Sequence, residues 1–131
     1  SGRVAFFRDA EDAIVAYARH VFELGERDAT GATVRDHLIA SARKGSVTSA
    51  AALVPPVLPS AFAYLWEWFV SLHRRREQGM NGPAGFTWPA LDAWARRTAV
   101  EPTPWEFDVL TAVDEAFLTI AYRSIAASAK G

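Results

Sequence analysis

The sequence predicts an all-α fold: a single compact domain of about five to six helices, with a Gly/Pro-rich loop between the central and C-terminal helices. Apolar residues recur at intervals of three and four, the period of a helix, in nearly every patterned segment. The 131 residues, 50% of them hydrophobic, suffice for one globular domain and leave no room for a second. Cysteine is absent, so the fold depends on an apolar core without disulfides or thiolate metal ligands.

The first helix is expected from Asp9, a good capping residue, to Leu24, and Gly25 should end it. Its inward positions are Ile14, Ala18, Val21 and Phe22. Ser1-Gly2 has the form of a cleavage scar, so we count the predicted domain from residue 3 to residue 131. Within it, residues 3–30 form the N-terminal helix and its connection, and residues 33–127 form the helical body.

The second helix should begin at Thr33, which forms a capping pair with Asp36, and should end at Gly45. Its inward residues are Leu38, Ile39 and Ala42. The Ala-rich segment 46–54 then leads into Pro55, Pro56 and Pro59. Because proline disfavours helix at the residue before it, we expect an extended hinge here, inside one domain.

The central helix should run from Ser60 to about Gln78. Its main apolar stripe is made of Phe62, Leu65, Trp66, Phe69 and Leu72. Tyr64 and Trp68 fall off this stripe, so the helix is apolar around most of its circumference and must be covered on two sides. The run 74–76 is all arginine, which suits the negative end of a helix dipole; we interpret it as a solvated helix end, with a phosphate-binding patch as the alternative.

Residues 79–85 read Gly-Met-Asn-Gly-Pro-Ala-Gly, which predicts a flexible or tightly turned loop. The spacing of a nucleotide-binding glycine loop is missing, so the loop is interpreted as structural. A helix over 87–97 follows, with Leu91, Trp94 and Ala95 inward.

The last helix is predicted over 103–127, because Thr103-Pro104-Trp105-Glu106 combines a cap, a first-turn proline and a capping-box acid. Its inward residues are Phe107, Leu110, Val113, Phe117, Ile120 and Ala121. Asp114 lies among them. A carboxylate is costly to bury alone, so Asp114 should pair with an arginine or a helix N-terminus.

Charge and motifs argue against several function classes. With 14 basic and 15 acidic side chains, the net charge of −1 does not favour nucleic acid as a partner. The apolar stretches are too short for a membrane span or a secretory signal. A helix-turn-helix over 32–60 fails because its second part, 46–54, lacks the polar and basic residues that read bases.

Catalytic patterns are also missing. His20, His37 and His73 fall on three separate predicted helices without metal-ligand spacing. Neighbouring carboxylates such as Glu11 and Asp12 diverge by about 100° on a helix and form no close dyad. The sequence therefore predicts no catalytic, cofactor-binding or metal site, and no enzyme.

All five tryptophans lie between positions 66 and 105. Such a concentration of indoles exceeds what a small helical core usually needs, and a tryptophan at an interface is a typical binding anchor. Trp66, Trp94 and Trp105 are expected in the core. For Trp68 and Trp88, core packing and partner binding are both open.

Several motifs occur in a characteristic order, and together they resemble the small tail assembly chaperones of long-tailed phages and prophages. The series comprises Leu53-Val54-Pro55-Pro56, Ala63-Tyr64-Leu65-Trp66-Glu67-Trp68-Phe69 with Leu72 and Arg76, Gly82-Pro83, Trp88, Leu91-Asp92-Ala93-Trp94, Pro104-Trp105-Glu106 and Val113-Asp114-Glu115-Ala116-Phe117-Leu118. The resemblance covers about Val34 to Leu118 and leaves the first helix unmatched.

The resemblance implies a helical protein of the host bacterial cytoplasm that works beside the tape measure protein during tail building. The tape measure protein would be the main partner, the tail tube protein a second candidate, and a homo-oligomer stays open; no cofactor, nucleic acid or membrane is implied. Two alternatives remain: a structural or adaptor protein of the phage particle, and a small DNA-binding regulator.

If the resemblance holds, the chain would cover apolar helical stretches of the tape measure protein and release them as tail protein polymerises. Helix-in-groove binding anchored by aromatics fits this role. The candidate protein-binding residues are Tyr64, Trp68, Phe86 and Trp88, each with core packing as its alternative. For a binding role, Trp68→Ala should weaken the complex and leave the melting temperature nearly intact.

Overall fold

The structure, a computed structural model, describes residues 2–130 and is mainly helical. Its α-helices are α1 (Gly2–Leu24), α2 (Val34–Arg43), α3 (Val47–Ala52), α4 (Ala63–His73), α5 (Trp88–Arg97) and α6 (Pro104–Lys130). A 3-10 turn, η1 (Ser60–Phe62), precedes α4, and the short strands β1 (Gln78–Gly79) and β2 (Gly82–Pro83) pair antiparallel between α4 and α5. The predicted all-α fold is confirmed.

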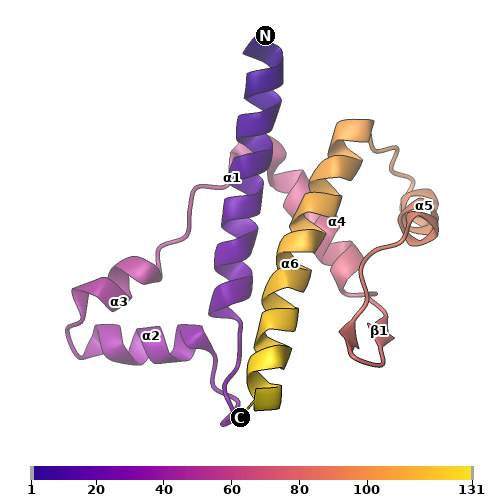
Figure 1. Cartoon of the computed structure of the whole chain (residues 1–131). Coiled ribbons are helices and arrows are strands. Elements are labelled where there is room, and N and C mark those ends of the chain that lie inside the picture. The colour runs from indigo at the N-terminus through magenta and orange to yellow at the C-terminus, as the bar shows by residue number, and fades with distance from the viewer. Residues whose placement is uncertain (1, 131) are drawn as a thin grey trace.

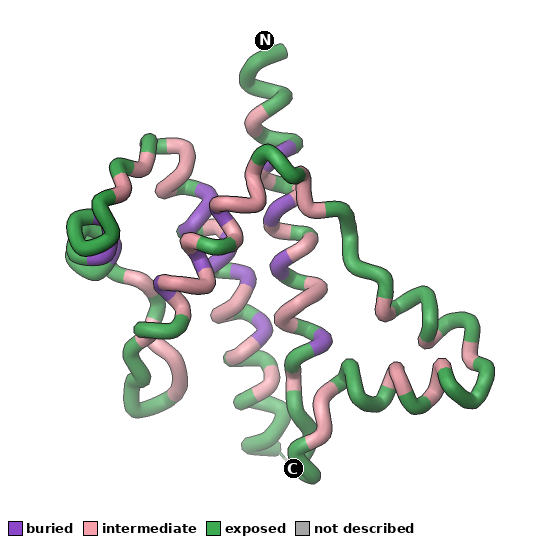
Figure 2. The backbone as a smooth tube through the Cα atoms, turned by 180° about the vertical axis from the view of Figure 1, so that it is seen from behind, coloured by how far each residue is buried: buried purple, intermediate pink, exposed green. Residues whose placement is uncertain are grey.

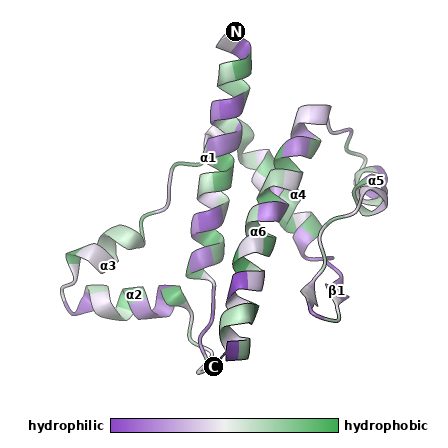
Figure 3. Ribbon diagram, viewed as in Figure 1, coloured by the Kyte–Doolittle hydropathy of each residue, from purple (hydrophilic) through white to green (hydrophobic). Residues whose placement is uncertain are grey.

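The two longest helices, α1 and α6, lie side by side and form the centre of the molecule, and α4 crosses behind α6 (Figure 1). Hydrophilic and hydrophobic residues alternate along α1 and α6, as expected for helices with one covered face (Figure 3). Most of the buried positions lie where these helices meet (Figure 2). The core consists of Ile14, Ala18, Leu65, Phe69, Leu72, Leu91, Trp94, Ala95, Val109, Leu110 and Val113.

Helix α1 begins earlier than the sequence indicated. Asp9 is exposed inside the helix and does not cap it, so the predicted start was wrong. The preceding turn is stabilised by aromatic contacts with distant residues: the ring centroid of Phe7 lies 4.8 Å from that of Trp105, and Phe6 lies 5.9 Å from Phe62. The predicted end at Leu24 is correct.

The α2 prediction is confirmed in detail, because Thr33 and Asp36 form a complete capping box. Helix α3 was missed. The backbone N–H of Ser49 donates to the Ser46 side chain, which caps the helix, and the following alanines have high helix propensity. Neither α2 nor α3 contains a buried residue, and the two helices form an arm beside the main body (Figures 1 and 2). The extended passage through the prolines follows as expected.

Helix α4 ends at His73, five residues before the predicted Gln78. Arg74 and Arg75 are exposed, as expected for a solvated helix end. Arg76 is different, since its side chain is only 3% exposed and pairs with Asp114 of α6. This inward turn of the chain ends the helix, and no local sequence signal predicts it.

The predicted turn after α4 is a tight hairpin held against α6. The hydroxyl of Tyr122 donates to the carbonyl oxygen of Pro83 at 2.6 Å. Gly82 has φ +138°, and a Cβ there would lie 2.8 Å from Cδ1 of Ile125. The backbone angle therefore favours glycine, and a Cβ there would also displace the tip of the Ile125 side chain.

The last two helices begin where the sequence predicted. Thr87 caps α5 through the N–H of Ala90, and Thr103 and Glu106 form the capping box of α6. Helix α6 continues to Lys130, slightly past the predicted end. Among the helices of residues 2–130, none combines the length and the hydrophobicity that a membrane crossing requires.

Candidate protein-binding groove

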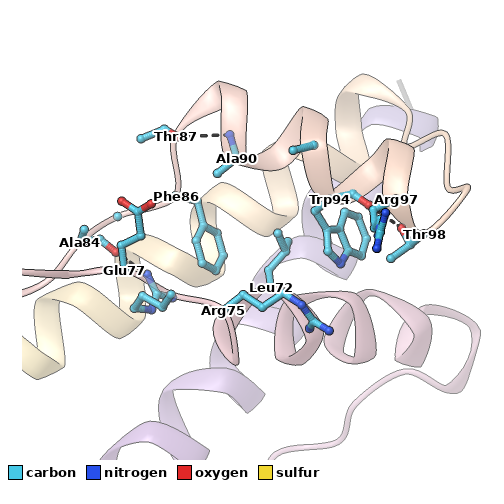
Figure 4. Close-up of a pocket in the computed structure, with 13 residues that line it drawn as sticks. Leu72, Arg75, Glu77, Ala84, Phe86, Thr87, Ala90, Trp94, Arg97 and Thr98 are labelled. Atoms are coloured by element: carbon cyan, nitrogen blue, oxygen red, sulfur yellow. Dashed lines mark hydrogen bonds between the residues drawn. The ribbon is translucent and has the colours of Figure 1, made fainter.

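An apolar groove of about 360 Å³ lies between the C-terminal end of α4, the segment 84–87 and one face of α5 (Figure 4). It is lined by Leu72, Arg75, Arg76, Glu77, Ala84, Gly85, Phe86, Thr87, Ala90, Ala93, Trp94, Arg97 and Thr98. The site thus combines residues from two helices and the loop that joins them.

The floor of the groove is made of apolar side chains that the core holds in place. Leu72 and Trp94 are buried, and the indole N–H of Trp94 donates to the Ser71 hydroxyl at 3.0 Å. Phe86 packs on Phe69 of the core, with their ring centroids 5.7 Å apart. A rigid apolar floor of this kind can receive a partner's side chains without first rearranging.

Charged side chains stand at the rim. Arg75, Glu77 and Arg97 are exposed, and none of them forms an ion pair with another described residue. One guanidinium nitrogen of Arg75, Nη1, donates to the carbonyl oxygen of Ser71 at 2.9 Å. Figure 4 shows Glu77 near Phe86 and Arg97 near Trp94, so the two ends of the groove differ in charge.

A buried ion pair fixes the loop wall of the groove. Nη2 of Arg76 lies 2.6 Å from Oδ1 of Asp114, and Nη1 of Arg76 donates to the carbonyl oxygen of Ala84 at 2.9 Å. The other Asp114 oxygen, Oδ2, accepts the backbone N–H of Phe86 at 2.9 Å. The expectation that Asp114 pairs with an arginine is confirmed. Loop residues 84–86 are therefore hydrogen-bonded to Arg76, which follows α4, and to Asp114 of α6.

Aromatic rings enclose the same guanidinium. Its carbon lies 4.2 Å from the ring centroid of Phe86 and 4.4 Å from that of Phe117, within the range of cation–π attraction. Nε of Arg76 donates to Nδ1 of His73 at 3.0 Å. Burial, and then the positive charge of Arg76, lower the pKa of His73 below its ordinary value of 6.5, so the imidazole is neutral and accepts the bond.

The structure separates the four predicted binding residues. Phe86 lines the groove directly. Trp68 is half-buried and does not line it; its ring lies 5.8 Å from that of Trp94 and 4.9 Å from that of Tyr64. The Tyr64 hydroxyl donates to Oε2 of Glu106 at 2.5 Å, and burial together with this contact raises the tyrosine pKa to about 12. Tyr64 and Trp68 thus contact each other outside the groove lining.

Trp88, the fourth predicted residue, is 74% exposed at the start of α5. It does not line the groove, and its ring lies 6.3 Å from that of Phe107. Among the core candidates, Trp94 is buried, and Trp66 and Trp105 are half-buried against the core. A role of the four predicted residues in binding stays a prediction.

Sequence reasoning missed most of the groove. Leu72 and Trp94 were assigned only to the core, and Arg97 was given no role. The spacing of Ala90, Trp94 and Arg97 places all three on one face of α5, which is the signal that could have revealed this wall. The opposite wall comes from α4, and only the tertiary structure brings the two walls together.

Histidines and carboxylates elsewhere do not assemble into a comparable site. His20 contacts the carbonyl oxygen of Ala52 at 2.9 Å, and His37 contacts Asp28 at 2.6 Å on the surface. A bond from the Thr30 hydroxyl, with that of His37, lowers the pKa of Asp28 to about 2. Within residues 2–130, no group of three histidine, cysteine, aspartate or glutamate side chains is placed to hold a metal ion.

Comparison with known families gives one match. A family model described as phage tail assembly chaperone matches residues 41–119, more than half of the chain. The matched segment contains every residue that lines the groove and leaves α1 outside. No curated protein and no solved structure matches the chain.

Proposed function

Because the chain belongs to the phage tail assembly chaperone family, we propose that it binds the tape measure protein and covers its apolar helical segments while the tail is built. The proposed place of action is the cytoplasm of the bacterial host. The tail tube protein is a second proposed partner, met when tail protein replaces the chaperone. This role is one of binding and release, without covalent chemistry.

The observation that carries the proposal is the apolar groove inside the family match. A long apolar helical protein associates with itself before tail subunits enclose it, unless its apolar faces are covered. A groove with a floor of Leu72, Phe86 and Trp94 can accept the apolar face of such a helix. The same groove leaves the rest of that helix open to the arriving tail protein.

The size of the groove supports reversible binding. Its volume of about 360 Å³ is at the lower end of the range of ligand pockets, so it can take only a few side chains of a partner helix. The exposed indole of Trp88 offers an additional contact on the same helix, α5. A small contact area limits affinity, which suits a chaperone that must leave during assembly.

The proposal is tested by co-expressing the chain with the tape measure protein of the same phage or prophage. Ala90 is exposed and lines the groove, so Ala90→Trp should fill the groove and leave the fold intact. With this variant, we expect most of the tape measure protein that the wild type keeps soluble to disappear from the soluble fraction. Ala40→Trp makes the same change on an exposed face of α2 and should have no effect.

Two results would count against the proposal. The first is equal solubility of the tape measure protein with and without the wild-type chain. The second is a stoichiometric amount of the chain in purified virions, measured by mass spectrometry, since a chaperone is absent from the finished particle and an adaptor protein is not. Circular dichroism of both variants ensures that a loss of function is not a loss of fold.

A further inference from the structure

We propose that the groove selects a partner helix that carries an acidic side chain next to its inserted apolar residue, with the acid facing Arg75 and Arg97. This inference rests on the proposed function and specifies the chemistry of the segment that is bound. The apolar residue enters between Leu72, Phe86 and Trp94, and the acid lies at the Trp94 end of the groove.

Arg75 and Arg97 have no partner for their charge among the residues that the structure describes. Both are exposed at the rim, and neither forms an ion pair with any residue from 2 to 130. The third arginine of the groove, Arg76, is neutralised by Asp114, so it adds no free charge. A bound helix can therefore gain two ion pairs that the free chain lacks.

The charge balance at the Trp94 end of the groove is positive. Helix α5 ends here, and a helix C-terminus contributes about half a negative charge. Arg96 and Arg97 are the last two residues of this helix, and Arg75 lines the groove from the segment that follows α4. The positive charge of these arginines exceeds what the helix end compensates, in a chain whose net charge is −1.

The position of Glu77 makes the charge of the rim uneven. It lines the groove at the Phe86 end, away from Arg97 (Figure 4). A partner acid placed there would meet a like charge, whereas at the Trp94 end it meets two opposite charges. The charge pattern thus favours one location for the acid, which a uniformly basic rim would not do.

The test uses three synthetic amphipathic peptides that are identical except for the residue beside the central leucine, which is glutamate, glutamine or lysine. Binding is measured by calorimetry at low and high salt. The glutamate peptide should bind roughly fivefold more tightly than the glutamine peptide, as expected for one to two exposed ion pairs, and the lysine peptide more weakly. High salt should reduce these differences.

Charge variants test whether Arg75, Arg97 and Glu77 cause the difference in affinity between the peptides. The double variant R75E/R97E should reverse the order of the peptides, and Glu77→Gln should strengthen binding of the glutamate peptide up to about twofold. The control R35E/R43E changes the charge by the same amount on exposed positions of α2 and should keep the wild-type order. An unchanged order in R75E/R97E would overturn the inference.

The inference and the proposed function can fail separately. If the tape measure protein binds wild type and R75E/R97E equally well, the charge selection is refuted and the chaperone role stands. If the tape measure protein does not bind but the peptides follow the predicted order, the proposed function fails and the charge selection stands. Concentration-dependent self-association that R75E/R97E abolishes would show a second copy of the chain as the occupant, and would overturn the inference.

Discussion

The buried ion pair between Arg76 and Asp114 should be the most sensitive point of the structure. The two side chains are 3% and 7% exposed, so neither can exchange its partner for water. Asp114→Ala removes the carboxylate that neutralises Arg76 and accepts the backbone N–H of Phe86. The charge of Arg76 would then remain buried without a counter-charge, and the N–H of Phe86 would lose its acceptor.

The expected loss can be worked out from these contacts. Removing one member of a buried ion pair costs about 3–5 kcal/mol. A domain of this kind has a total free energy of unfolding of about 5–15 kcal/mol, so the variant should be close to its stability limit. With a urea m-value of about 2 kcal/mol/M, a loss of 4 kcal/mol moves the unfolding midpoint down by about 2 M.

Urea unfolding followed by tryptophan fluorescence and by circular dichroism measures this loss. Glu115→Ala is the matched control, because Glu115 is exposed and is the next residue of α6. This variant should lose less than about 0.5 kcal/mol in free energy of unfolding. The double variant R76M/D114L should lose less than the sum of its single variants, because no unpaired charge remains. A midpoint for Asp114→Ala within about 0.5 M of wild type, at unchanged m, would refute the reasoning.

Three further predictions concern single positions. The sequence alone led us to expect a nearly intact melting temperature for Trp68→Ala, but the structure changes this prediction: the variant should melt about 5 °C lower, because the half-buried ring packs on two other aromatics. The exposed Trp88→Ala should leave the melting temperature unchanged, and a reversed result in thermal unfolding would show that the contacts of Trp68 add no stability. Folding lowers the pKa of His73 below 6.5, so the unfolded chain binds more protons in acid than the folded chain. The contribution of His73 to stability should therefore be complete above pH 6.5 and decline below it. In His73→Phe, the melting temperature should change less with pH below 6.5; an unchanged slope would assign the effect to other groups. Gly82→Ala should lower the free energy of unfolding, measured in urea, by about 1–3 kcal/mol, because alanine is strained at the positive φ of this position and its Cβ meets the tip of Ile125. An unchanged free energy would mean that the hairpin moves freely away from α6.

Sequence reasoning succeeded where a structure depends on neighbouring residues. Thr33 with Asp36 and Thr103 with Glu106 fix the starts of α2 and α6 through bonds that span three residues. The burial of Asp114 was also predictable, because its position on an apolar face needed only the helical period. Local pattern thus gave five of the six α-helices described in residues 2–130, and for Asp114 the need for an arginine or a helix N-terminus.

Sequence reasoning failed where distant residues decide. The end of α4 depends on the contact of Arg76 with Asp114, and the part of α1 before Asp9 is supported by the contact of Phe7 with Trp105. Neither contact leaves a trace in the local pattern. The same holds for the groove, since Arg75 follows α4, Arg97 ends α5, and the two line one groove only after folding. The small helix α3 was missed because the prolines that follow it dominated the interpretation.

The position of Phe69 explains how the excess of aromatic residues is used. Its ring lies 5.6 Å from that of Phe22 of α1 and 5.7 Å from that of Phe86 at the groove. Helix α4 is therefore covered by more than one element, as its apolar circumference required, and one of these elements, α1, lies outside the family match. We propose on this ground that residues 3–131 are one domain. Because α1 already covers part of α4, we expect the proposed partner to bind where the surface stays open, at the groove and the exposed Trp88.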